Sequence, residues 1–172
     1  MAFETFVFAW LMAQPMHVTD LDEPEFNEPD RLSRMSQIAE AVTIVGDGSR
    51  ITVATLLVTM KRESAFRWDV QSGNCPSASR PKSECDGGAA RGLAQLHRPS
   101  AYPKERWMSW AGPEYLNLVY SLTQAKAMID GAFSSCRSLE GAISRYATGN
   151  LCYWSGAQER ADEIRALAAR IR

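Results

Sequence analysis

Apolar residues recur three and four positions apart along much of the chain, a spacing that places them on one face of a helix. Five such stretches follow a short apolar run near the N-terminus, and they cover residues 30–45, 49–63, 113–131, 138–149 and 155–171. In the second stretch, the run Ile51–Val58 has two threonines as its only polar residues. A helix that is apolar on most sides is buried by its neighbours. We therefore expect a mainly α domain whose other helices wrap around residues 49–63.

Residues suited to helix ends mark these boundaries. Asp and Ser favour the N-cap, Pro favours the first helical position, and Gly favours the stop. The boundary residues are Asp30, Gly46–Gly48, Ser49, Pro113, Ser138, Gly149 and the capping box formed by Ser155 and Gln158. Local sequence alone thus predicts where most of the helices begin and end.

We expect residues 1–29 to be a separate region, an apolar helix followed by an acidic, proline-containing tether. Residues 6–13 have the length of a secretion-signal core, but Glu4 precedes them and no Lys or Arg does. We interpret this run as a short packed helix, with a remnant of a targeting segment as the alternative. No run reaches the ~20 apolar residues of a membrane-spanning helix, so we expect no such span.

Between residues 67 and 90 the helical spacing disappears, and glycines and prolines predict irregular backbone with room for a short hairpin. Farther along the chain, Trp107 and Trp110 lie in an aromatic cluster. An exposed indole ring offers an apolar face on which a sugar can stack, but tryptophans in domains of this size also fill cores. Both interpretations stay open for these two residues.

The charge balance bears on possible partners. Nineteen basic and twenty acidic residues leave a net charge of −1. A protein that binds nucleic acid neutralises phosphates with clustered Lys and Arg. We therefore expect no nucleic-acid partner.

Four cysteines lie away from the strongest helical stretches. Local pairing, the simplest of three connectivities, joins Cys75 to Cys85 and Cys136 to Cys152. Such bridges predict an extracytoplasmic protein, whether periplasmic, secreted or virion-associated. Zinc ligation is the competing interpretation, but the chain has no Cys-x-x-Cys pair and its two histidines lack ligand spacing. Four free thiols are the third possibility, and we expect neither a metal nor another cofactor.

The strongest candidate for chemistry is Glu63, at the end of the apolar helix. It lies seven residues after Leu56 and three after Met60, so it shares their helix face. Desolvation on that face disfavours the charged carboxylate, as a general acid working near neutral pH requires. A solvated glutamate at a helix end is the alternative that this stretch alone leaves open.

Three separated motifs stand in a characteristic order: Glu63-Ser64, Gly92-Leu93-Ala94-Gln95 and Tyr146-Ala147-Thr148-Gly149. Over roughly residues 31–149 this arrangement resembles the lysozyme-like superfamily, in particular its soluble lytic transglycosylase and goose-type lysozyme branch. The resemblance implies a lysozyme-like helical domain over residues 30–172, with an irregular or small β-containing cleft segment. It also implies a peptidoglycan glycan strand as the partner.

The resemblance implies a role for each motif residue. Glu63 would be the catalytic acid and then base, and Ser64 would line the subsite for the N-acetyl group of the sugar. Gln95 would bind the glycan, Gly92 would allow close approach of sugar and backbone, and Tyr146 would orient the Glu63 carboxylate. The chain departs from the family pattern at two positions: Ala147 replaces an Asn, and Ala94 replaces the usual Met. The segment between the first two motifs is also longer than usual.

These roles predict a peptidoglycan lytic transglycosylase. It would cleave the β-1,4 bond between N-acetylmuramic acid (MurNAc) and N-acetylglucosamine (GlcNAc), leaving a 1,6-anhydromuramyl product. A muramidase would need a second carboxylate. The candidates for that carboxylate are Asp69, Glu84 and Asp86, all in the irregular segment. A catalytically silent glycan-binding module is the other alternative, and the oligomeric state stays open.

Overall fold

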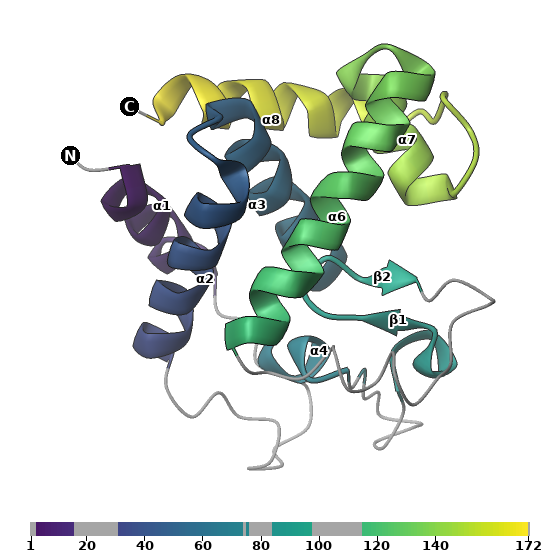
Figure 1. The fold of residues 1–172 in the computed structure, drawn as a ribbon. Coiled ribbons are helices and arrows are strands. Elements are labelled where there is room, and N and C mark those ends of the chain that lie inside the picture. The colour runs from purple at the N-terminus through teal and green to yellow at the C-terminus, as the bar shows by residue number, and fades with distance from the viewer. Residues whose placement is uncertain (1–2, 16–30, 74, 76–83, 98–114, 172) are drawn as a thin grey trace.

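The computed structural model describes residues 3–15, 31–73, 75, 84–97 and 115–171. Over these residues the protein is mainly α with one small two-stranded sheet, which confirms the predicted fold class (Figure 1). The helices are α1 (Phe3–Met12), α2 (Arg31–Gly46), α3 (Arg50–Ser64), α4 (Trp68–Gln71), α6 (Tyr115–Cys136), α7 (Leu139–Thr148), α8 (Ala157–Arg170) and the 3-10 helix η2 (Cys85–Gly88). Strands β1 (Ala90–Arg91) and β2 (Leu96–His97) pair antiparallel, with Ala90 opposite His97.

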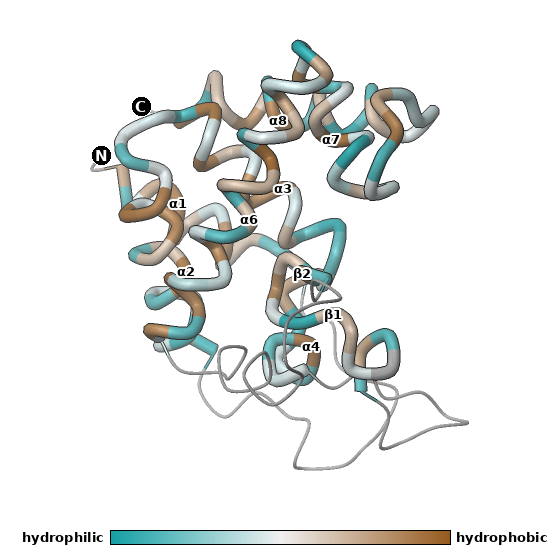
Figure 2. Tube along the Cα trace, turned by 45° about the vertical axis from the view of Figure 1, so that its right-hand side comes forward, coloured by the Kyte–Doolittle hydropathy of each residue, from teal (hydrophilic) through white to brown (hydrophobic). Residues whose placement is uncertain are grey.

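Helix α3 is the centre of the fold, as predicted. Every residue from Val53 to Met60 is buried, and α2, α6 and α8 pack against the helix. Ser49 begins α3 as its N-cap, because its side chain accepts a hydrogen bond from the Thr52 N–H. Figure 2 shows the hydrophobic stretches of α1, α2 and α3 next to one another. The chain thus folds around a helix that its neighbours bury on most sides.

The N-terminal apolar run forms the short packed helix that the sequence predicts. Helix α1 packs against α2, and Val7 and Leu11 are fully buried in the same core as α3. The predicted tether and the Asp30 cap lie outside the described residues. Among the described helices, none combines the length and hydrophobicity needed to cross a membrane.

Two of the predicted helix boundaries are wrong. Helix α6 continues past Gly131 to Cys136, because Gly131 sits on an open face where a helix tolerates glycine at a cost of about 1 kcal/mol. Helix α8 has Gly156 as its N-cap without a side-chain hydrogen bond, so the capping box at Ser155 is not formed. Gln158 instead donates to Asp162 one turn farther on.

Helix α7 and both disulfides confirm local predictions. Ser138 caps α7 by accepting from the Gly141 N–H, and Gly149 ends it. Cys75 is bonded to Cys85, and Cys136 to Cys152. The second bridge joins the end of α6 to the loop after α7, so both ends of α7 are tied to the rest of the fold.

Candidate active site

The backbone around Glu63 is held firmly by the way α3 ends. Glu63 is followed by Ser64, the last residue of α3, and by Ala65, a left-handed cap whose N–H donates to Lys61 O. Buried Arg34 of α2 then donates to Phe66 O over 2.6 Å. This buried charged contact fixes the turn after the helix, and with it the direction in which Glu63 projects.

The Glu63 carboxylate lies in a polar contact rather than in an apolar pocket. Its side chain is 24% exposed, and its Oε1 lies 2.6 Å from Nη1 of Arg160 in α8. A hydrogen bond between a guanidinium and a carboxylate is charge-assisted and stronger than one between neutral groups. The apolar environment expected from helix periodicity is thus replaced by a cation that is 97 residues away in sequence.

The Glu63 pair belongs to a row of charge pairs between α3 and α8. Lys61 contacts Glu163 over 2.5 Å, and Arg62 contacts both Glu163 and Glu159. Burial raises the pKa of Glu163, but the hydrogen bonds from Lys61 and Arg62 outweigh it and hold the pKa below its usual range. The C-terminal end of α3 is therefore joined to α8 by polar contacts, which we call the charge row.

Arg160 is supported from its other side by an aromatic ring. The guanidinium carbon lies 5.0 Å from the ring centroid of Trp154, a cation–π contact. Trp154 lies in the segment between Cys152, which the second disulfide anchors, and the start of α8. Neither Arg160 nor Trp154 was predicted from the sequence, because no local spacing links them to Glu63.

Tyr146 brings the three sequence motifs together. Its hydroxyl donates to Ala94 O over 2.7 Å, which ties α7 to the turn between β1 and β2. Burial, and then the negative charge of Glu63, raise the pKa of Tyr146, so the phenol stays protonated and remains a donor. The hydroxyl is therefore bonded to the second motif and lies within the electrostatic reach of the first.

The Gly92–Gln95 motif forms the hairpin turn itself. Gly92 and Gln95 both have positive φ angles, of 70° and 47°, and the Gln95 N–H donates to Gly92 O. The Gln95 side chain also donates to Gly92 O, over 2.9 Å. A positive φ is a sufficient reason for glycine at position 92. In this structure the Gln95 amide closes the turn.

Ser64 has an internal role at the end of α3. It is 4% exposed, its hydroxyl donates to Met60 O over 2.8 Å, and its oxygen accepts from the Phe66 N–H. These contacts stabilise the helix end beside Glu63. The N-acetyl subsite that the resemblance implies for Ser64 would require this hydroxyl to exchange partners.

The three candidates for a second carboxylate are each engaged by a base close in sequence. Asp69 is 2% exposed and accepts two hydrogen bonds from Arg67. Glu84 lies 3.1 Å from buried Arg91. Asp86 is exposed and lies 3.5 Å from His97. Trp107 and Trp110 lie outside the described residues.

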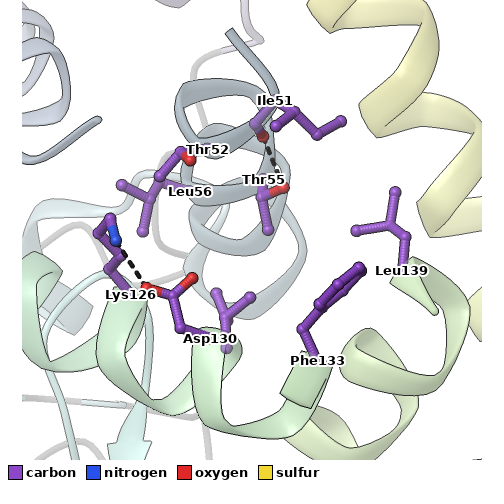
Figure 3. Close-up of a pocket in the computed structure, with 9 residues that line it drawn as sticks. Ile51, Thr52, Thr55, Leu56, Lys126, Asp130, Phe133 and Leu139 are labelled. Carbon is purple, nitrogen blue, oxygen red and sulfur yellow. Dashed lines mark hydrogen bonds and ion pairs between the residues drawn. The ribbon is translucent and has the colours of Figure 1, made fainter. Parts of the chain in front are cut away.

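A separate pocket lies toward the other end of α3. It has a volume of about 290 Å³ and is bounded by α3, α6 and the start of α7 (Figure 3). Thr55 and Leu56 face Phe133 and Leu139 across it, and the ion pair between Lys126 and Asp130 lies at its edge. The pocket is mostly apolar, and its single carboxylate is already paired. We therefore place the candidate chemistry at Glu63 rather than in this pocket.

Comparison with family models, curated proteins and solved structures finds no match to this chain.

Proposed function

We propose that the protein is a peptidoglycan lytic transglycosylase that cleaves the β-1,4 bond between MurNAc and GlcNAc, with Glu63 as its acid and base. The observation that carries this proposal is the convergence of the three motifs. Tyr146 is bonded to the Gly92–Gln95 turn and lies within the field of the Glu63 carboxylate. The second and third motifs are in contact although Ala94 and Tyr146 are 52 residues apart, and the charge of Glu63 at the end of the central helix reaches Tyr146.

The chemistry requires a single carboxyl group that works twice. Protonated Glu63 donates its proton to the glycosidic oxygen as the bond to muramyl C1 breaks. The resulting carboxylate then takes the proton of the C6 hydroxyl, whose oxygen bonds to C1. The products are a 1,6-anhydromuramyl end and a free hydroxyl on the departing sugar, and Glu63 is again protonated. Because the nucleophile belongs to the substrate, its effective concentration is high.

The contacts of the other carboxylates favour this route over hydrolysis. A muramidase needs a second carboxylate that is free to activate water or to attack C1. Asp69 and Glu84 are held by Arg67 and Arg91, and exposed Asp86 lies 3.5 Å from the equally exposed His97. A muramidase, the alternative enzyme, would have to release one of these pairs.

A silent glycan-binding module is the second candidate, and the contact between Glu63 and Arg160 favours it. A carboxylate paired with arginine across two helices is also what a purely structural ion pair looks like. In that case the convergence of motifs would preserve a glycan-binding surface without turnover.

Digestion of purified peptidoglycan distinguishes the three candidates. Parent protein and the Glu63→Gln variant are incubated with it, and the released muropeptides are weighed by mass spectrometry. A lytic transglycosylase yields anhydro products, lighter by one water than the reducing ends that a muramidase yields, and the variant yields neither. Binding of peptidoglycan without products from the parent protein would support the silent module.

The two disulfides are compatible with an extracytoplasmic protein. We propose that it acts in the periplasm, outside the cell or on a virion, where peptidoglycan is accessible.

A further inference from the structure

Arg160 is held between two partners and has binding capacity left over. Nη1 contacts Glu63, and the guanidinium carbon lies over the ring of Trp154. A guanidinium has five N–H donors, of which the Glu63 contact uses one. The Arg160 side chain is 18% exposed, so part of it can be reached from solvent.

The contact between Glu63 and Arg160 can open without leaving other charges unpaired. In the rest of the charge row, the two bases Lys61 and Arg62 contact the two acids Glu159 and Glu163. These four charges balance among themselves. Opening the contact between Glu63 and Arg160 therefore leaves Lys61, Arg62, Glu159 and Glu163 paired. Within the charge row, Arg160 is the only base that needs a new partner.

The proposed chemistry makes such an opening necessary. A general acid must present its proton to the glycosidic oxygen, whereas Glu63 Oε1 here accepts a hydrogen bond from Arg160 Nη1 over 2.6 Å. The contact seen here therefore corresponds to a resting site. Something that accompanies the substrate must take the place of Glu63 on the guanidinium.

We propose that Arg160 is a carboxylate-binding, positioning residue of this site, and that a carboxylate of the bound glycan strand replaces Glu63 on its guanidinium. This inference rests on the proposed function, which supplies the glycan strand as ligand. Each muramyl residue carries a lactyl group whose carboxylate is free when no peptide is attached. The exchange conserves charge, since Arg160 keeps one anionic partner while Glu63 takes up one proton from solvent.

The side chains around Arg160 suit this exchange. Arginine binds carboxylates through two parallel N–H groups, which gives such a ligand a more favourable geometry than the single Nη1 contact to Glu63. The Trp154 ring holds the guanidinium plane through a contact that does not depend on Glu63. Arg160 therefore stays in place when its anionic partner changes.

Binding measurements test the inference by affinity rather than by cleavage, at low temperature, and mass spectrometry of the ligand after each titration verifies that it is intact. Isothermal titration compares a peptide-free GlcNAc–MurNAc tetrasaccharide, which carries lactyl carboxylates, with neutral chitotetraose. The parent protein should bind the anionic ligand more tightly than chitotetraose. Arg160→Met should lower the affinity for the anionic ligand about tenfold and leave the affinity for chitotetraose unchanged. Arg160→Lys should restore part of the preference. Glu63→Gln should raise the affinity for the anionic ligand several-fold, because a neutral amide competes less well for Arg160.

Arg62→Met is the matched control, because Arg62 belongs to the same charge row but contacts Glu159 and Glu163 instead of Glu63. It should leave the preference for the anionic ligand unchanged, and circular dichroism verifies that each variant is folded. If the parent and folded Arg160→Met prefer the anionic tetrasaccharide over chitotetraose equally, the inference is wrong.

The outcomes for this inference and for the proposed function are separable. Suppose that peptidoglycan yields anhydro products but the preference for the anionic tetrasaccharide does not depend on Arg160. The proposed enzymatic function would then be retained, and the proposed role of Arg160 would be wrong. An Arg160-dependent preference without any products would leave a carboxylate-binding glycan module. If peptidoglycan yields no products and neither tetrasaccharide binds, both proposals are wrong.

Discussion

The two ends of α3 are built in different ways. Near its start, Ile51 and Leu56 line an apolar pocket together with residues of α6 and α7. Near its end, Lys61, Arg62 and Glu63 are joined to α8 by the charge row. The apolar end offers volume but little chemistry, whereas the charged end holds the Glu63 carboxylate, whose charge reaches Tyr146. Within a single helix, packing and chemistry are therefore separated along the axis.

The largest expected effect of a single substitution is at the charged end. Glu63→Gln should lower peptidoglycan cleavage by about 10²–10⁴-fold, because the amide keeps the size of the side chain but supplies no proton. The free energy of unfolding should change by only about 1 kcal/mol, since the amide oxygen still accepts from Arg160. Turbidity clearing and urea denaturation measure the two quantities. Clearing by the variant at the parental rate would remove Glu63 from its proposed role.

Leu56→Ala should have the opposite effect to Glu63→Gln: a large loss of stability and little loss of cleavage. Leu56 is 1% exposed, and its truncation should lower the free energy of unfolding by about 2–5 kcal/mol. Cleavage by the folded fraction should persist at low temperature, because the charge row is unaltered. Phe133→Ala is the control, since Phe133 lines the same pocket but is 50% exposed. An equal loss of stability in both variants would contradict the distinction between buried and open parts of the pocket.

Tyr146→Phe should have an intermediate effect on the cleavage rate and on the free energy of unfolding. It removes the hydrogen bond to Ala94 O and should cost about 1 kcal/mol of stability. Cleavage should fall about tenfold, because the hairpin turn loses its tie to α7 and shifts relative to Glu63. Tyr153→Phe is the control, as Tyr153 is 84% exposed. An unchanged cleavage rate in Tyr146→Phe would confine this residue to a structural role.

The smallest expected effect concerns acid stability. Because the pKa of Glu163 is lowered in the folded protein, its contribution to stability is present above the pKa of the unfolded chain and is lost as the pH falls through the folded pKa. Glu163→Gln should therefore cost up to about 1 kcal/mol at pH 7 and almost nothing at pH 2–3. Urea denaturation at both pH values measures the difference. If Glu163→Gln lowers the free energy of unfolding equally at both pH values, packing and not charge is responsible for the effect.

The sequence predicts well what neighbouring residues decide. Ser49 and Ser138 cap their helices through N–H groups only three residues away, and both disulfides close short segments. Gly131 misled the prediction because an exposed glycine weakens a helix without ending it. Glycine therefore marks a helix end reliably only where a positive φ is required.

The candidate site was predictable in part. The order of its motifs pointed to Glu63 and Tyr146, but not to Arg160, whose contact with Glu63 spans 97 residues. Helix periodicity predicts which face of a helix a residue occupies, but not which residue of another helix packs against that face. The expectation of an apolar environment for Glu63 failed for this reason, since the facing residue on α8 is a cation.

The packing of α8 against α3 has a consequence for how the chain is made. Ala161, Ile164 and Leu167 of α8 complete the burial around a helix that leaves the ribosome much earlier. Until α8 has emerged, the nascent chain lacks one wall of its core and cannot reach its final fold. Cys136 and Cys152 emerge before α8, so their bridge can form while the chain is still incomplete. The contacts of α8 with α3 and α7 are therefore the last ones that the core of the described residues acquires during synthesis.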